Sequence, residues 1–206
     1  VKINGEERQY PQGATYEDVA NDYQKEYDNL IALVARDGKI RELFKKLTRD
    51  CEITFFTLKD NVGNKTYVRS ATMLFLKAVF DVFGRETVQN CRVEFAIGNG
   101  SYISPKGKIN ATEENAAKIR NRMRELVEAK TPFLKRSYSL DNAMELFRRE
   151  GMKDKEKLFR YRRGSFVNIY EMDGYYDYYY GYMLPNAGYV KWFDVIAYED
   201  GFMLLL

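Results

Sequence analysis

The first 62 residues carry a succession of turn and cap signals that few arrangements of strands and helices can satisfy. Asn4-Gly5 and Asp37-Gly38 are strong hairpin turns, and each lies between short runs of strand-forming residues. Thr15, with Asp18 three residues later, is typical of a capped helix start, and this helix is expected to end near Tyr27. Strands are expected at 1–3, 8–11, 29–35, 40–43 and 51–58. This order of hairpin, helix and strands predicts a compact β-rich unit.

Residues 63–206 alternate amphipathic helices with short strands, which predicts an α+β fold with an antiparallel sheet. Helices are expected at 66–84, 112–130, 139–150 and 154–159, and strands at 93–97, 102–103, 133–138 and 166–170. An aromatic strand, a Pro185-to-Gly188 turn and a second strand are expected near the end of the chain. The link from Lys59 to Lys65, which contains Gly63, is expected to be a hinge.

Two segments far apart in the sequence carry a family resemblance. One is Tyr179-Tyr180-Gly181-Tyr182-Met183-Leu184-Pro185-Asn186-Ala187-Gly188, and the other is Arg69-Ser70-Ala71-Thr72-Met73-Leu74. They resemble the Cys-Gly-Gly-Thr-His-Val-Pro-Asn-Thr-Gly and His-Ser-x-x-His-Leu motifs of the editing domain of threonyl- and alanyl-tRNA synthetases. Residues 1–62 are similar to the β-grasp, ubiquitin-like TGS domain that precedes this domain in synthetases. The resemblance therefore implies a TGS domain at 1–62 and a synthetase-like second additional domain at 63–206.

The four polar positions of the editing site are all replaced in this chain. The two histidines that would share one helix face fall on Arg69 and Met73. The cysteine falls on Tyr179 and the last histidine on Met183, and the chain contains no histidine at all. The resemblance thus implies the fold without its chemistry, and we predict no catalytic residue and no editing hydrolysis.

The sequence gives little sign of any other catalytic, metal or phosphate-binding site. Cys51 and Cys91 lack metal-ligand spacing, so we expect two reduced, buried thiols and no metal site. Gly98-Asn99-Gly100-Ser101 lacks the spacing of a phosphate-binding loop and is expected to be a hairpin turn. The acidic residues Glu171, Asp173 and Asp177 are expected to be solvated charges. No cofactor is expected in this segment.

The replaced motifs define a candidate ligand cleft formed by Arg69, Met73, Tyr179, Tyr182 and Met183. A cation beside aromatic side chains suits a nucleotide. It equally suits a cleft filled by its own side chains, with Arg69 bound to an acid such as Asp177. Both interpretations stay open at this point.

Charge is distributed unevenly along the chain. Residues 1–62 carry a net charge of −2, residues 105–165 carry +8, and residues 166–206 carry −5. This pattern favours mutual attraction within one fold and solvated helix faces, with a patch for the phosphates of a nucleotide or nucleic acid as the alternative. The candidate phosphate or RNA contacts are Arg160, Tyr161, Arg162 and Arg163.

The run from Leu158 to Arg163 and the tyrosine-rich segment after it also resemble bacterial nucleoside kinases of the uridine kinase type. These carry a TGS domain and an inactivated synthetase-like domain before a P-loop kinase domain. The resemblance implies that this segment is a non-catalytic regulatory or ligand-binding region, with the kinase domain as its partner in cis. ATP and Mg²⁺ are then expected only for that domain, which is absent from this chain, and the bare Leu204-Leu205-Leu206 end suggests that a longer chain continues.

The alternative is a tRNA- or RNA-binding TGS and synthetase-like module without editing activity. A bound nucleotide or RNA is a possible ligand under either interpretation. No run of about 18 apolar residues occurs, so no membrane span is expected. Together with the expected reduced thiols, this favours a cytoplasmic location.

Overall fold

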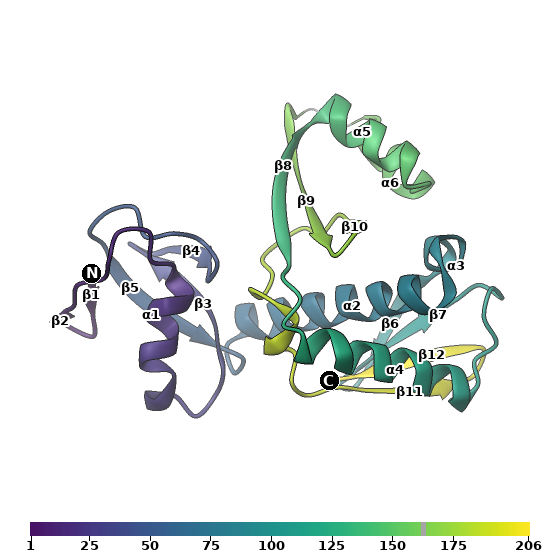
Figure 1. Cartoon of the computed structure of the whole chain (residues 1–206), viewed down its shortest axis with the longest axis horizontal. Helices are drawn as coiled ribbons and strands as arrows, with labels where there is room; N and C mark the ends of the chain where they lie inside the picture. The colour runs from purple at the N-terminus through teal and green to yellow at the C-terminus, as the bar shows by residue number, and fades with distance from the viewer. Residues whose placement is uncertain (162–163) are drawn as a thin grey trace.

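The computed structural model describes residues 1–161 and 164–206, and its first part is a sheet that curls around one helix (Figure 1). The sheet has the order β2-β1-β5-β3-β4, with β1 parallel to β5 and the other neighbours antiparallel. Its elements are β1 (Lys2–Ile3), β2 (Glu6–Glu7), α1 (Tyr16–Tyr23), the 3₁₀ turn η1 (Gln24–Glu26), β3 (Ile31–Arg36), β4 (Lys39–Glu42) and β5 (Glu52–Thr57). The central strand β5 thus lies between the β1–β2 and β3–β4 hairpins in a mixed sheet.

The local signals that predicted this unit act as expected. Asn4 and Asp37 adopt φ values of 52° and 50°, and the glycines after them also have positive φ, which the tight hairpin turns require. The Thr15 hydroxyl accepts from the amide of Asp18 at 3.2 Å, and Asp18 Oδ2 accepts from the amide of Thr15 at 2.7 Å. This reciprocal cap fixes the start of α1, whose apolar side joins the core of the unit.

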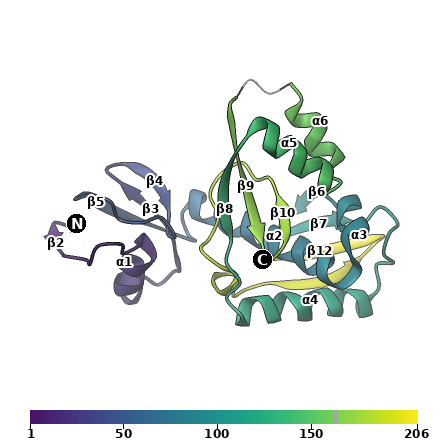
Figure 2. The same cartoon turned by 45° about the horizontal axis from the view of Figure 1, so that its top comes forward.

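The larger part is built on a second, four-stranded antiparallel sheet of order β11-β12-β7-β6 (Figures 1 and 2). The long helices α2 and α4 pack against each other and onto this sheet. The elements are α2 (Asn61–Phe83), α3 (Arg85–Asn90), β6 (Arg92–Ile97), β7 (Gly100–Ser104), α4 (Glu113–Glu128), β11 (Asp194–Tyr198) and β12 (Gly201–Leu205). The hairpin predicted at Gly98-Asn99-Gly100 is confirmed by the pairing of β6 with β7.

A third sheet projects from this body and carries two helices at its far end (Figure 1). It has the order β10-β9-β8 and is antiparallel throughout. Its elements are β8 (Leu134–Ser139), α5 (Leu140–Arg149), α6 (Lys153–Phe159), β9 (Phe166–Met172) and β10 (Tyr175–Asp177). Ser139 caps α5 as predicted, since its hydroxyl accepts from the amide of Asn142. The predicted α+β class with antiparallel sheets is therefore what the structure has, apart from the one parallel pair.

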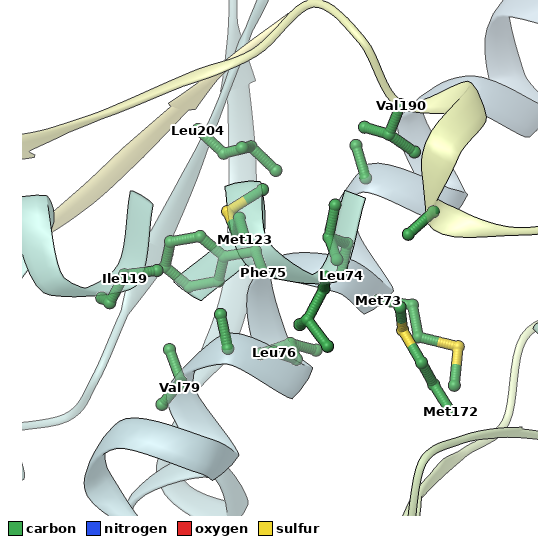
Figure 3. Close-up of a cluster of buried hydrophobic side chains, with 14 of the residues drawn as sticks. Met73, Leu74, Phe75, Leu76, Val79, Ile119, Met123, Met172, Val190 and Leu204 are labelled. Carbon is green, nitrogen blue, oxygen red and sulfur yellow. The ribbon is translucent and has the colours of Figure 1, made fainter. Parts of the chain in front are cut away.

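The main core lies between α2, α4 and the four-stranded sheet (Figure 3). Phe75, Ile119 and Met123 are fully buried, and the ring of Phe75 lies 6.3 Å from that of Phe202 on β12. Apolar side chains at helical spacing on α2 and α4 thus form the interface that holds the sheet.

Most of the link between the two predicted domains is helical. Helix α2 begins at Asn61, so the predicted boundary after residue 62 falls in its first turn. A Cβ atom on Gly63 would lie 2.0 Å from the carbonyl oxygen of Thr57. This glycine therefore allows α2 to start tightly against the end of β5, and its role is packing instead of flexibility.

Of the strand, turn and second strand predicted over residues 179–195, the turn forms, but the first strand is wrong and the second begins later than expected. After β10 the chain runs without a ladder through the 3₁₀ turn η2 (Ala187–Tyr189), and the next strand begins only at Asp194. We call residues 178–193 the tyrosine loop.

The helices of the described residues were compared with the length and hydropathy that a membrane span needs, and none of them meets both.

The core makes a direct prediction for Phe75. We expect Phe75→Ala to lower the free energy of unfolding by about 3–5 kcal/mol, because it leaves a cavity between α2 and β12. The matched control is Val82→Ala on the same helix, whose side chain is 37% exposed and which should cost less than about 1 kcal/mol. Urea unfolding followed by circular dichroism measures both, and equal losses would contradict the packing described.

Candidate functional site

Side chains of α2 hold the backbone of the tyrosine loop. The Tyr67 hydroxyl donates to the carbonyl of Trp192 at 2.5 Å and accepts from the amide of Trp192 at 2.8 Å. The Ser70 hydroxyl accepts from the amide of Leu184 at 3.0 Å, and Arg69 Nη1 donates to the carbonyl of Tyr182 at 2.6 Å. These bonds satisfy buried backbone groups that a ladder would otherwise have to pair, which is why the segment is not a strand.

The Pro-Asn-x-Gly portion of the motif anchors the loop at its other end. The Asn186 side-chain oxygen accepts from the amide of Gly188 at 3.0 Å, and the carbonyl of Pro185 accepts from the amide of Phe133 at 3.1 Å. A Cβ atom at Gly188 would lie 2.9 Å from Asn186 Oδ1, so only glycine fits without displacement. The motif therefore fixes the path of the loop before β11.

Two of the predicted cleft residues, Met73 and Met183, are fully buried. The thioether of Met183 lies 3.9 Å from the Ser70 hydroxyl, and Met73 lies against Met172 (Figure 3). Both side chains belong to the main core. Two of the three positions that carry histidine in the resembled motifs are thus filled with soft apolar side chains that pack into this irregular space.

Arg69 fills a further part of the same place. A Cβ atom on Gly181, which has φ of 126°, would lie 2.7 Å from the guanidinium carbon of Arg69. Partial burial lowers the pKa of Arg69 from its ordinary value, and its charge faces the carbonyl of Tyr182. The predicted pairing of Arg69 with Asp177 is wrong, since Asp177 pairs with Lys155. Arg69 is therefore a strut between α2 and the loop.

Tyr179 and Tyr182 complete the predicted cleft and are half-buried. Tyr179 packs edge-to-face on Tyr170 with ring centroids 6.4 Å apart, and burial raises the pKa of its hydroxyl well above the ordinary value. The structure thus brings Arg69, Tyr182 and Met183 together around Ser70. The interpretation of a cleft filled by its own side chains agrees with this geometry; that it binds a ligand stays a prediction.

A cavity of about 220 Å³ lies beside this place, between α2, α3, α6 and β10. It is lined by Asp177, which is only 6% exposed although the sequence predicted a solvated charge. Its carboxylate accepts from the amide of Tyr178 at 2.7 Å and from the Tyr175 hydroxyl at 3.3 Å, and it lies 3.4 Å from Lys155 Nζ. The alternation along β10 turns Asp177 inward, and that was the signal available in the sequence.

Charge in this cavity is balanced. Burial raises the pKa of Asp177 above its ordinary value, with the Lys155 ammonium acting in the opposite direction. For Lys155, burial disfavours the charged form, but the attraction of Asp177 and Asp154 outweighs it and the pKa is raised. The pair is a buried ion pair that joins α6 to β10.

Cys91 also lines the cavity and is buried. Burial raises the pKa of its thiol to about 12, so the thiol stays protonated near neutral pH. Cys51 is likewise buried and free, and burial raises its pKa. The prediction that both thiols are buried is confirmed, and neither forms a disulfide; that they are reduced stays a prediction. Within residues 1–161 and 164–206 no cluster of three or more acidic or thiol side chains could hold a metal ion.

The predicted phosphate or RNA contacts lie at the end of α6. Tyr161 is 84% exposed, and the Arg160 guanidinium is exposed and lies 3.9 Å from Glu156. Arg162 and Arg163 lie outside the described residues. An exposed aromatic ring beside a cation is a surface that a nucleic acid could contact.

The basic middle and the acidic tail attract each other across the fold. Arg120 pairs with Asp194 at 3.1 Å, Arg136 with Glu171 at 3.1 Å, and Lys155 with Asp177 at 3.4 Å. Mutual attraction, which the sequence analysis favoured, accounts for these cations. Because these cations are paired within the fold, fewer cations are free to bind an external anion than the net charge of residues 105–165 suggests.

The chain is similar to threonine–tRNA ligases over nearly its whole length. It is 28% identical over 205 residues to the ligase of Thermotoga neapolitana, a match that covers 98% of the chain. The ligase of Thermotoga maritima is 27% identical over 206 residues and also covers 98%. That of Symbiobacterium thermophilum is 26% identical over 203 residues and covers 96%. The chain spans about 31% of the length of each of these relatives.

No family model matches the chain. The relatives support the resemblance to the synthetase region and the fold it implies. They lend no support to the further resemblance to a nucleoside kinase.

The strut role of Arg69 predicts a specific loss of stability. We expect Arg69→Ala to lower the free energy of unfolding by about 1–3 kcal/mol, because the carbonyl of Tyr182 loses a charged donor. The control is Arg136→Ala, whose ion pair with Glu171 is surface-exposed and should be worth less than about 1 kcal/mol. Chemical unfolding measures both, and an Arg69→Ala variant as stable as the parent chain would contradict the strut.

Proposed function

We propose that the chain is an RNA-binding module of the threonine–tRNA ligase type that has no editing hydrolysis. The observation that carries this is the closed motif, in which Met73 and Met183 are core side chains and Arg69 is bound to the loop backbone. A hydrolytic site needs a general base or a metal-bound water, and neither histidine nor a metal-ligand cluster stands here. Where the resembled motifs carry three histidines, this chain has two buried methionines and an arginine that is bound to the loop backbone.

The RNA half of the proposal rests on the similarity and on the surface of α6. The relatives are ligases that act on tRNA by name, and the match runs along 98% of the chain. Arg160 and Tyr161 present a cation and a ring at the end of α6. Phosphate contacts would supply affinity, and the ring would stack on an unpaired base.

The kinase remains a separate prediction from the sequence. It requires a P-loop domain in cis, with ATP and Mg²⁺ bound there, and the relatives do not support it. A reading frame that continues past Leu206 into a Walker-type loop would revive it, and a stop codon there would end it.

RNA binding should be sensitive to salt. Fluorescence anisotropy with labelled tRNA should show binding at low ionic strength that weakens steeply as salt rises. Arg160→Ala should lower the slope of log K against log salt by about 1, and Tyr161→Ala should weaken binding by about fivefold or more. Lys118→Ala on α4, whose side chain pairs with Glu114, should change neither.

Two results would contradict this proposal. Absence of binding at low salt would reject RNA as the ligand, and tight binding that does not change with salt would reject phosphate contacts as its source. Equal effects of Arg160→Ala and Lys118→Ala would show that only net charge matters and that α6 is not the contact surface.

Hydrolysis should be absent. We expect the chain to release amino acid from a mischarged tRNA no faster than buffer does, because the replaced positions offer no base. Thin-layer analysis of a labelled aminoacyl-tRNA measures the release. Release above the buffer rate that is lost in Asp177→Asn would instead place a hydrolytic site in the neighbouring cavity.

A further inference from the structure

A cavity of about 430 Å³ lies where β4 and the segment after it face β8. Its lining is strongly basic, with five cationic side chains and one carboxylate: Arg36, Arg41, Lys45, Lys46, Lys135 and Glu42. The net charge of residues 1–62 is negative, so the charge distribution along the sequence gives no sign of this basic cavity. The cavity is large enough for a small ligand.

The one carboxylate in the cavity already has partners. Glu42 is 3% exposed and lies 3.0 Å from Lys135 Nζ, and it accepts from the Tyr170 hydroxyl at 2.5 Å. The charge of Lys135 is therefore balanced by Glu42. Within residues 1–161 and 164–206, no ion pair within 4.0 Å engages the other four cations of the lining. An uncompensated cluster of like charges in a concavity favours a bound anion.

The frame that carries these cations is well fixed. Arg41 pairs with Val34 across the β3–β4 ladder, and Arg36 is two residues from Val34, so both arginines belong to one face of the hairpin. The carbonyl of Lys45 accepts from the amide of Tyr16 at 2.9 Å, and Lys46 forms a β-bridge with Thr15. The start of α1 thus holds both lysines in place beside the arginines.

The wall of the cavity includes a buried tyrosine. Tyr16 lines the cavity and is fully buried, and its hydroxyl makes no hydrogen bond to any described residue. This hydroxyl is closed off from solvent, so the ligand contacts that the cavity offers come from the cations of its lining. A phosphate oxygen is a strong acceptor that such cations attract.

We propose that this cavity binds a ligand with two or more adjacent phosphates. The shared chemistry is a cluster of phosphate oxygens, from either a free nucleoside polyphosphate or the backbone of an RNA strand. The site does not depend on the contacts assigned to α6, so it extends the proposed function and can fail separately from it. Tyr182, which also lines the cavity, would lie beside a base carried by either ligand.

Isothermal titration of the whole chain with sodium tripolyphosphate, ATP and a short single-stranded RNA tests the site. We expect at least one probe to bind, and the double variant Lys45→Ala/Lys46→Ala to weaken its binding by about tenfold or more. The control is Lys118→Ala/Arg149→Ala, which removes the same charge from α4 and α5 and should leave affinity unchanged.

Tyr16→Phe is a second control, in the wall of the cavity. It removes only a buried hydroxyl that lacks a partner, so we expect unchanged affinity with a melting temperature that is unchanged or higher. Arg41→Gln provides a second change of charge at a partly exposed position if the lysine variant loses its fold.

The titration results distinguish a free polyphosphate from an RNA backbone as the ligand. Tripolyphosphate or ATP binding that is lost in the lysine variant identifies a free polyphosphate, while RNA binding alone that is lost there identifies the backbone. No binding by any probe, or equal losses in the lysine variant and the control, overturns the site. RNA binding that depends on Arg160 and Tyr161 but not on Lys45 and Lys46, without polyphosphate binding, overturns the site and leaves the proposed function standing.

Discussion

Hydrogen bonds from the first half of α2 to the backbone of the tyrosine loop are what the larger part of the fold depends on. Tyr67, Arg69 and Ser70 satisfy amides and carbonyls at three points of a loop that has no ladder. Without them the buried backbone groups would have no partner, and each would cost the desolvation of a hydrogen-bonding group. The helix that opens the resembled editing motif is thus a structural clamp in this chain, and its polar residues are committed to holding the loop.

The sequence predicted best where the signals are local. Thr15 with Asp18 and Asn4-Gly5 act on their own neighbours, so the helix and four of the five N-terminal strands lie close to where they were expected. The strand expected at 8–11 forms at Glu6–Glu7 instead. The strand predicted in the tyrosine loop was wrong because strand propensity depends on the segment alone, whereas the hydrogen-bond partners of this segment are more than 100 residues away. The packing role of Gly63 could not be predicted for a related reason, since only the nearby end of β5 shows that a side chain would not fit there.

The same limit applies to charge. Sums along the sequence marked the middle as basic, yet Arg120, Arg136 and Lys155 are paired with carboxylates of the acidic tail. Asp177 looked solvated in a tyrosine-rich segment and is buried against Lys155. The cations without an ion pair that line a common cavity belong instead to a unit of net negative charge. Which side chains share a surface depends on the fold, and regional net charge does not contain that information.

The segment from Pro185 to Gly188 has a structural role of its own. The amide of Ala187 donates to the carbonyl of Thr131, and Asn186 Nδ2 donates to Glu17 of α1 at 3.3 Å. Together with the bond from Phe133 to Pro185, these contacts tie the loop, the start of β8 and the N-terminal unit at one point. A substitution there would weaken all three contacts. Met73 and Met183 take part in none of these bonds and pack in the main core, so the path of the loop and the packing of the two methionines depend on different atoms.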